Sequence, residues 1–119
     1  MAADYKQQQR DLIAKEVKGK LQYERINPTF VEGLADVVTK GAEKYSETHL
    51  LIPDMRIGAN RDPHQLIAAL ERHTQELKKA LQRGELAESV DPDLGTHHIH
   101  NATCNLMMLH NVIELESYN

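Results

Sequence analysis

The fold is decided by the segment "DPHQLIAALERHTQELKKALQRG", which spans residues 62 to 84. Its first two residues, Asp62 and Pro63, are typical of a helix N-terminus, because aspartate caps unpaired N–H groups and proline fits the first helical turn. Gly84 is typical of the position that ends a helix. Between them, leucines recur on one helical face, at Leu66, Leu70, Leu77 and Leu81. The segment therefore predicts an amphipathic helix from Pro63 to about Arg83.

The rest of the chain repeats the helical pattern on both sides of this segment. Asn27 and Pro28 open a second predicted helix, which runs to about Tyr45. Its apolar side consists of Val31, Leu34, Val38, Gly41, Ala42 and Tyr45. A last helix is predicted from about Thr96 to Ser117, with an apolar side formed by Ile99, Ala102, Leu106, Leu109 and Ile113. Residues 3 to 17 predict a polar, peripheral helix. Residues 1 to 119 are therefore expected to form one all-α domain resembling a four-helix bundle.

The composition narrows the class of protein. Hydrophobic residues make up 40% and charged residues 27% of the 119 positions, as in ordinary globular domains. A formal net charge of −4 and an aromatic content of 4% disfavour nucleic acid as a partner, since such binding uses basic surfaces and stacked rings. The single cysteine excludes an internal disulfide. No signal peptide or long apolar run is evident, which predicts a cytoplasmic protein with no membrane partner.

One side of the predicted second helix is acidic. At 100° per residue, Glu32, Asp36 and Glu43 fall within about 40° of one another. Hard cations such as Mg²⁺ and Mn²⁺ prefer several oxygen ligands, which successive helical turns can supply. The alternative is a solvated helix face with no ligand, which any surface helix shows.

The stretch "LGTHHIHNATCN", residues 94 to 105, is rich in nitrogen. On a regular helix His98, Asn101 and Asn105 form one polar stripe, whereas His97 and His100 point elsewhere. The three histidines therefore cannot converge on one zinc ion unless this turn is irregular. The stripe could read a base edge or form the outer shell of a metal, since amides and imidazole both donate and accept hydrogen bonds. Polar residues at a helix seam are the alternative.

Several basic residues are candidates for phosphate binding. Lys18 and Lys20 flank Gly19, and Arg72 precedes His73 in the predicted third helix. Cationic side chains stabilise phosphate oxygens. Solvated lysines and a histidine at the edge of the core are the alternatives. The connection from Glu47 to Asn60 is long enough to be a functional loop or lid.

Taken in order, these motifs resemble the phage dATP/dGTP diphosphohydrolase family. The resemblance covers about residues 18 to 110 and is carried by "KGKLQYERINP" (18 to 28), Glu32, "GAEKY" (41 to 45), Arg72-His73, Arg83-Gly84-Glu85, Asp91, and the glycine, paired histidines and asparagine of the stretch ending at Asn105. That family is similar to the all-α MazG-like nucleotide pyrophosphatases, including the phage branch called MazZ. The location would be the host cytoplasm for a phage-encoded protein.

The resemblance implies a metal-dependent enzyme that splits a purine deoxynucleoside triphosphate, dGTP or dATP, into monophosphate and pyrophosphate. It also implies a homodimer or a dimer of dimers, in which an adjoining copy turns the acidic helix side into a cleft wall. Glu32 and Asp36 are then the expected catalytic metal ligands for Mg²⁺ or Mn²⁺, with Glu43 beside them. The rest of the metal set is left open among Glu71, Glu85, Asp91 and His98.

The resemblance also implies residues that bind each end of the substrate. Lys18, Lys20 and Arg72 would hold the triphosphate, whereas His98, Asn101 and Asn105 would lie near the sugar or base. Two other classes stay open: a non-catalytic helical interaction module and a histidine-based metal-binding protein.

Overall fold

Helices make up most of the chain in the computed structural model, which describes residues 2–45 and 57–117. The long helices are α1 (Ala2–Val17), α2 (Pro28–Tyr45), α4 (Pro63–Arg83) and α5 (His98–Ser117), with short 3-10 turns η1 (Tyr23–Arg25) and η2 (Leu86–Glu88). Within these ranges the only β pairing is an isolated bridge between Val90 and His97. The predicted all-α class is therefore confirmed. Most of the predicted loop Glu47 to Asn60 lies outside the described residues.

The helix ends lie where the capping residues predict them. Asn27 Oδ1 accepts a hydrogen bond from the Thr29 N–H at 2.9 Å, and Asp62 Oδ1 accepts one from the His64 N–H at 3.0 Å. Gly84 takes a left-handed conformation with φ of 71°, and its N–H donates to carbonyls of the last turn of α4. These local bonds satisfy groups that a helix leaves unpaired at its ends, so the boundaries are fixed by neighbouring residues.

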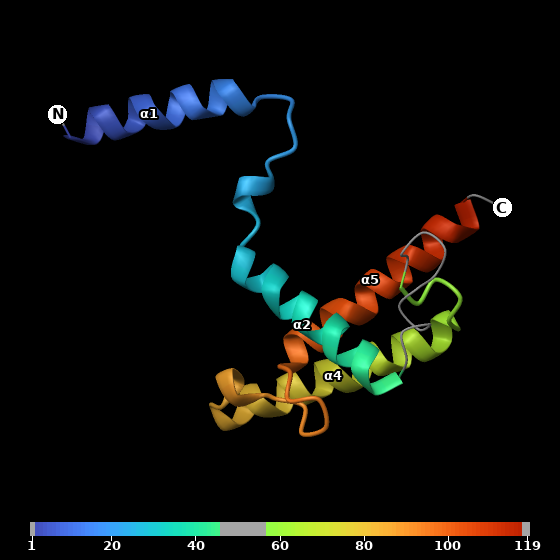
Figure 1. Cartoon of the computed structure of the whole chain (residues 1–119). Coiled ribbons are helices and arrows are strands. Elements are labelled where there is room, and N and C mark those ends of the chain that lie inside the picture. The colour runs from blue at the N-terminus through green and yellow to red at the C-terminus, as the bar shows by residue number, and fades with distance from the viewer. Residues whose placement is uncertain (1, 46–56, 118–119) are drawn as a thin grey trace.

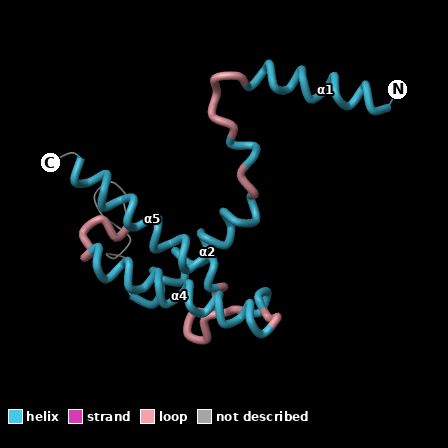
Figure 2. The backbone as a smooth tube through the Cα atoms, turned by 180° about the vertical axis from the view of Figure 1, so that it is seen from behind, coloured by secondary structure: helices cyan, strands magenta, loops and turns pink. Residues whose placement is uncertain are grey.

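The core forms where α2 and α4 both pack against α5. Among the described residues, the backbones of α2 and α4 each approach α5 closely, and Figures 1 and 2 show the three helices packed together. The buried apolar cluster consists of Val37, Leu66, Cys104, Met108 and Val112. Because α2 and α4 both pack against α5, a space remains between α2 and α4, and residues of α5 line one side of it.

The boundaries were easier to predict than the buried sides. Val31 and Leu81, both assigned to apolar faces, are exposed, whereas Val37 is buried. On α5 the predicted apolar side is wrong at Ile99, Leu106 and Ile113, which are 42%, 53% and 62% exposed. The side that packs on α2 and α4 instead carries a mixed set: His98, Asn101, Ala102, Asn105, Met108 and Val112. Internal hydrogen bonds make the burial of these polar residues tolerable.

Helix α1 stands apart from the packed helices. It contacts none of the other described helices, and Figure 1 shows it projecting away at the end of residues 18–27. The radius of gyration is 18.7 Å, against about 13 to 14 Å for a compact chain of this length. No helix in the described ranges is long and apolar enough to cross a membrane.

The crossing of α2 over α5 depends on a close approach at Gly33. A Cβ atom built there would overlap the ring of His100, which is itself packed edge-on against Phe30 with ring centroids 5.7 Å apart. A Cβ built at Gly41, also in α2, meets no atom within 4 Å. The two glycines therefore form a matched pair in one helix.

We expect Gly33→Ala to destabilise the protein by about 1 to 2 kcal/mol, since overpacking outweighs the gain in helix propensity. Gly41→Ala, which meets no such obstacle, should be neutral or stabilising by up to about 1 kcal/mol. Thermal unfolding followed by circular dichroism measures both. Equal melting temperatures for the two variants would mean that the His100 ring moves aside without cost and that the close approach at Gly33 does not need glycine.

Candidate functional site

The space between α2 and α4 is a cavity of about 300 Å³. Val37, Val38 and Gly41 of α2 line one side, and residues of α4 and α5 line the others. Its polar lining comes from Arg61, Gln65, Arg72, His73, Asn101 and Asn105. A cavity of this size, with apolar side chains and convergent polar groups in its wall, can hold a small molecule. Two arginines in this wall favour an anionic ligand.

The amides of Asn101 and Asn105 line the cavity but are also tied to their own helix end. Asn101 Oδ1 accepts a hydrogen bond from the Thr96 hydroxyl at 2.6 Å, and Asn105 Nδ2 donates to the Asn101 carbonyl at 2.9 Å. Both side chains are buried. These bonds fix the amide orientations, so any contact with a sugar or base would use the remaining donor and acceptor positions.

A second, more open hollow of about 570 Å³ adjoins the first. The two share Arg72 and His73 in their walls. The second hollow is also lined by Glu71, Glu76, Asp91 and His98, so it is rich in titratable groups. Arg72 therefore lies between an amide-lined cavity and a hollow that carries carboxylates and histidines.

Three groups in the second hollow could hold a metal ion. One ligand atom from each of His73, Asp91 and His98 lies within 4.8 Å of the others. The Nδ1 atoms of His73 and His98 are 2.9 Å apart, across a sequence separation of 25 residues. His98 is buried, and the other two are half-buried. The predicted candidates Asp91 and His98 are thus brought together, with His73 as a third member.

A hairpin-like loop between η2 and α5 sets this geometry. The Asp91 N–H donates to the Thr96 carbonyl, and the His98 N–H donates to the Ser89 carbonyl, each at 2.8 Å. Gly95, with φ of 74°, makes the turn between them. Asp91 Oδ1 also accepts from the N–H groups of Asp93 at 2.7 Å and Leu94 at 3.2 Å. The backbone of the loop therefore positions Asp91 beside His98.

The charge state of this cluster follows from its surroundings. Partial burial, the nearby His98 and Arg72 lower the pKa of His73, against an opposing effect of Asp91. Burial alone would raise the pKa of Asp91, but the two backbone N–H donors and both histidines outweigh it, so this pKa is lowered. A neutral imidazole and an ionised carboxylate at neutral pH are the forms that bind metals. Cys104 is different, because burial raises the pKa of its thiol.

The other predicted site residues lie elsewhere. Glu32, Asp36 and Glu43 are exposed, and none of them is among the described residues that line the two cavities. Asp36 pairs with Lys40 at 3.2 Å. Glu32 lies about 180° around the helix from Gly41, which faces the cavity. The role of these three carboxylates as metal ligands stays a prediction. It requires that another molecule pack against the exposed side of α2.

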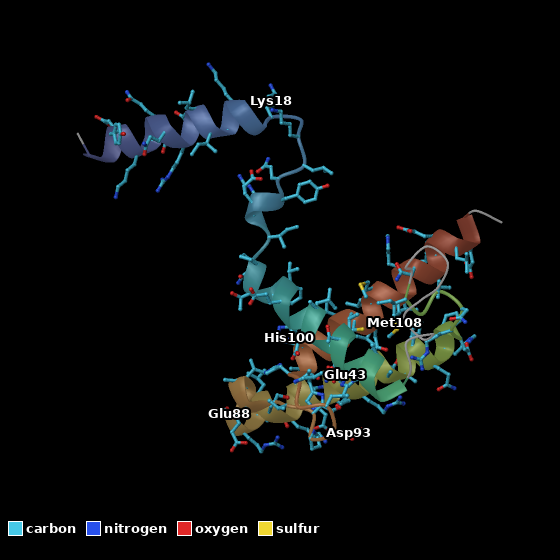
Figure 3. The ribbon with its side chains drawn as sticks, viewed as in Figure 1. Lys18, Glu43, Glu88, Asp93, His100 and Met108 are labelled. Atoms are coloured by element: carbon cyan, nitrogen blue, oxygen red, sulfur yellow. The ribbon has the colours of Figure 1, made fainter. Side chains whose placement is uncertain are left out.

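The two predicted phosphate-binding lysines are also remote in the single chain. Lys18 and Lys20 are exposed in the turn after α1, where Gly19 has φ of 80°. Figure 3 shows Lys18 at the α1 end of the linker, away from the packed helices that carry Glu43, His100 and Met108. Glu85, the other candidate of the open metal set, is exposed and lies 3.4 Å from Arg83. By contrast, Glu71 and Arg72 both line the second hollow, as do Asp91 and His98.

Sequence reasoning missed the roles of three residues in these walls. His73 was considered for phosphate binding, whereas the structure places it in the group that could hold a metal ion. Arg61 and Gln65 line the cavity and were not among the predicted site residues. The spacing of Gln65 and Arg72 could have indicated a shared role, because residues seven positions apart lie on the same side of a helix.

The fold and site define a small all-helical protein with a cationic, amide-lined cavity next to a candidate metal centre. The family model described as "dATP/dGTP diphosphohydrolase, N-terminal" matches residues 12–117, and the chain belongs to this family. The all-helical architecture is consistent with a MazG-like fold. No curated protein and no solved structure matches the chain.

Proposed function

We propose that the protein hydrolyses a purine deoxynucleoside triphosphate, dGTP or dATP, to the monophosphate and pyrophosphate. The observation that carries the proposal is the junction at Arg72, where a cavity suited to an anion meets a group of residues that could hold a metal. Family membership supports the same substrate class. Water would attack the α-phosphorus, the bond to the bridging oxygen would break, and pyrophosphate would leave with that oxygen.

Different residues in the cavity walls would contact different parts of the substrate. Arg72 would neutralise the phosphate oxygens as charge develops on the leaving pyrophosphate. Asn101 and Asn105, whose amides are held rigidly, would lie next to the sugar or base. A bound Mg²⁺ or Mn²⁺ ion would supply an activated water and Lewis-acid stabilisation of the phosphate. Glu71, Asp91 and His98 remain candidates for holding such an ion.

A complete site would require self-association as a dimer or dimer of dimers. Exposed apolar side chains repeat at intervals of seven along α5, at Ile99, Leu106 and Ile113. Helix α1 also projects from the body and buries no face against it. A second copy that covers these surfaces would bring new groups to the acidic side of α2, so that Glu32, Asp36 and Glu43 could act as ligands. Lys18 and Lys20 would reach the triphosphate in the same way.

The test is product analysis with the purified protein and eight triphosphates, four ribo and four deoxy, in the presence of Mg²⁺ or Mn²⁺. We expect dGTP or dATP to yield monophosphate and pyrophosphate in equal amounts, with no diphosphate intermediate. In a thermal-shift assay, Mn²⁺ and dGTP together should raise the melting temperature of the protein more than either does alone. This result would support a site that binds metal and nucleotide together, independently of turnover. Absence of both turnover and stabilisation would favour a helical interaction module, and the proposal would be abandoned.

A further inference from the structure

The proposed reaction gives no role to His73, whose imidazole faces that of His98. Their Nδ1 atoms lie 2.9 Å apart, and their ring centroids are 5.2 Å apart with an interplanar angle of 42°. Two nitrogens bound to one transition metal at 2.0 to 2.1 Å lie about 2.8 to 3.4 Å apart for angles between 90° and 110°. The observed spacing falls within that interval. A proton shared between the two nitrogens gives the same spacing, so a further observation is needed.

Asp91 supplies that observation. Its carboxylate comes from a different element, the loop after η2, and one of its oxygens lies within 4.8 Å of a ring nitrogen of each histidine. Its Oδ1 is held by two backbone N–H groups, so the carboxylate is oriented before any ligand binds. A pair of histidines sharing a proton would not require a third, preoriented oxygen ligand. The coordination shell would be completed by a small rotation of the His73 or Asp91 side chain.

We infer that His73, Asp91 and His98 form a binding site for a divalent transition metal such as Mn²⁺, Fe²⁺, Co²⁺ or Zn²⁺. The donor set decides the class of metal. Two imidazole nitrogens with one carboxylate suit first-row transition metals, whereas Mg²⁺ takes oxygen ligands in near-octahedral geometry. The exposed carboxylates on α2, by contrast, offer oxygen only. The two candidate sets would therefore differ in metal preference.

Three protein ligands leave coordination positions open. In catalytic metal sites such positions hold water or a substrate oxygen. Here the two hollows meet at Arg72 and His73, so the open positions lie beside a guanidinium group. An anionic oxygen bound there would contact the metal and Arg72 together. This last step rests on the proposed function, whereas metal binding itself does not.

The experiment is a titration of metal-free protein with Co²⁺, without nucleotide, followed by the visible d–d absorption of the bound ion. We expect saturation at one Co²⁺ per chain, and a hundredfold excess of Mg²⁺ should not displace it. Asp91→Asn and His73→Gln should each weaken binding at least about tenfold, since each removes one of three ligands. Both variants keep side chains that can make the local hydrogen bonds, and circular dichroism checks their folding.

The controls are histidines that pair with a carboxylate and, within the part of the chain that the structure describes, belong to no cluster of three possible ligands. His110 lies 2.6 Å from Glu114 and His64 lies 3.1 Å from Asp62, both at the surface. His110→Gln and His64→Gln should bind Co²⁺ like the unaltered protein. Equal Co²⁺ affinity in all five proteins, or displacement by Mg²⁺ at equal concentration, would overturn the inference. A protein that binds Co²⁺ through these residues but hydrolyses no triphosphate would keep the metal site and lose the proposed function.

Discussion

Replacing Arg72 by alanine is expected to lower kcat/KM for the preferred deoxynucleoside triphosphate by about a hundredfold or more. Arg72 lies in the walls of both hollows and beside His73, so its charge acts where the phosphates and the metal would meet. A cation aimed at developing negative charge in a partly enclosed site contributes more than the same cation in water. Steady-state kinetics with pyrophosphate release as the readout measures the loss.

Two further substitutions separate charge from geometry. Arg72→Lys keeps the positive charge but loses the planar donor pair, so it should recover only part of the activity. Arg83→Ala removes an arginine from the last turn of the same helix, outside the walls of both described cavities, where it pairs with Glu85 at 3.4 Å. That control should be close to unaltered protein in activity. If Arg72→Ala and Arg83→Ala behave alike, the cavity does not bind the triphosphate.

Local chemistry explains why the helix boundaries could be predicted. Asn27 and Asp62 cap helices through N–H groups two residues further on, and Gly84 ends α4 through carbonyls of the preceding turn. Each of these bonds joins residues close in sequence. A sequence pattern therefore contains both partners of the interaction, and the prediction needs no knowledge of how the helices pack.

The buried side of α5 could not be predicted in the same way. Hydrophobic spacing favoured Ile99, Leu106 and Ile113 as the packed side, yet these residues are exposed while Asn101 and Asn105 are buried. The polar side is stabilised by bonds such as that between the Thr96 hydroxyl and Asn101 Oδ1. A periodic apolar pattern identifies a surface that packs, but does not say whether the partner is the same chain or another copy.

The metal-binding group shows a second limit of sequence reasoning. Asp91 lies in the loop after η2 and His98 begins α5, so only six residues separate them, and a local argument could have paired them. His73 comes from α4, and only the packing of α4 against α5 brings it to His98. The neighbouring residue Arg72 was predicted to bind phosphate. His73 instead faces the imidazole of His98.

The second large effect is expected for Glu32→Gln, which should lower kcat about a thousandfold, since a metal contributes several kcal/mol to phosphoryl chemistry and each 1.36 kcal/mol is tenfold in rate. Glutamine preserves the shape of the side chain and removes its charge. Because Glu32 is exposed, the substitution should leave the helical circular dichroism spectrum and the melting temperature unchanged. Glu88→Gln, an exposed substitution in η2, is the matched control and should retain full activity.

The position of Glu32 makes the outcome informative about assembly. Among the described residues Glu32 lies on the side of α2 opposite the cavity, so we expect an adjoining copy to complete the site that it serves. Mixing inactive Glu32→Gln with inactive Arg72→Ala protein, with exchange of subunits, should then restore activity. For a dimer, about a quarter of the sites would regain both native residues. Restoration would require that Glu32 and Arg72 of one site come from different copies. A fully active Glu32→Gln protein would remove Glu32 from the metal set and contradict its role as a catalytic ligand.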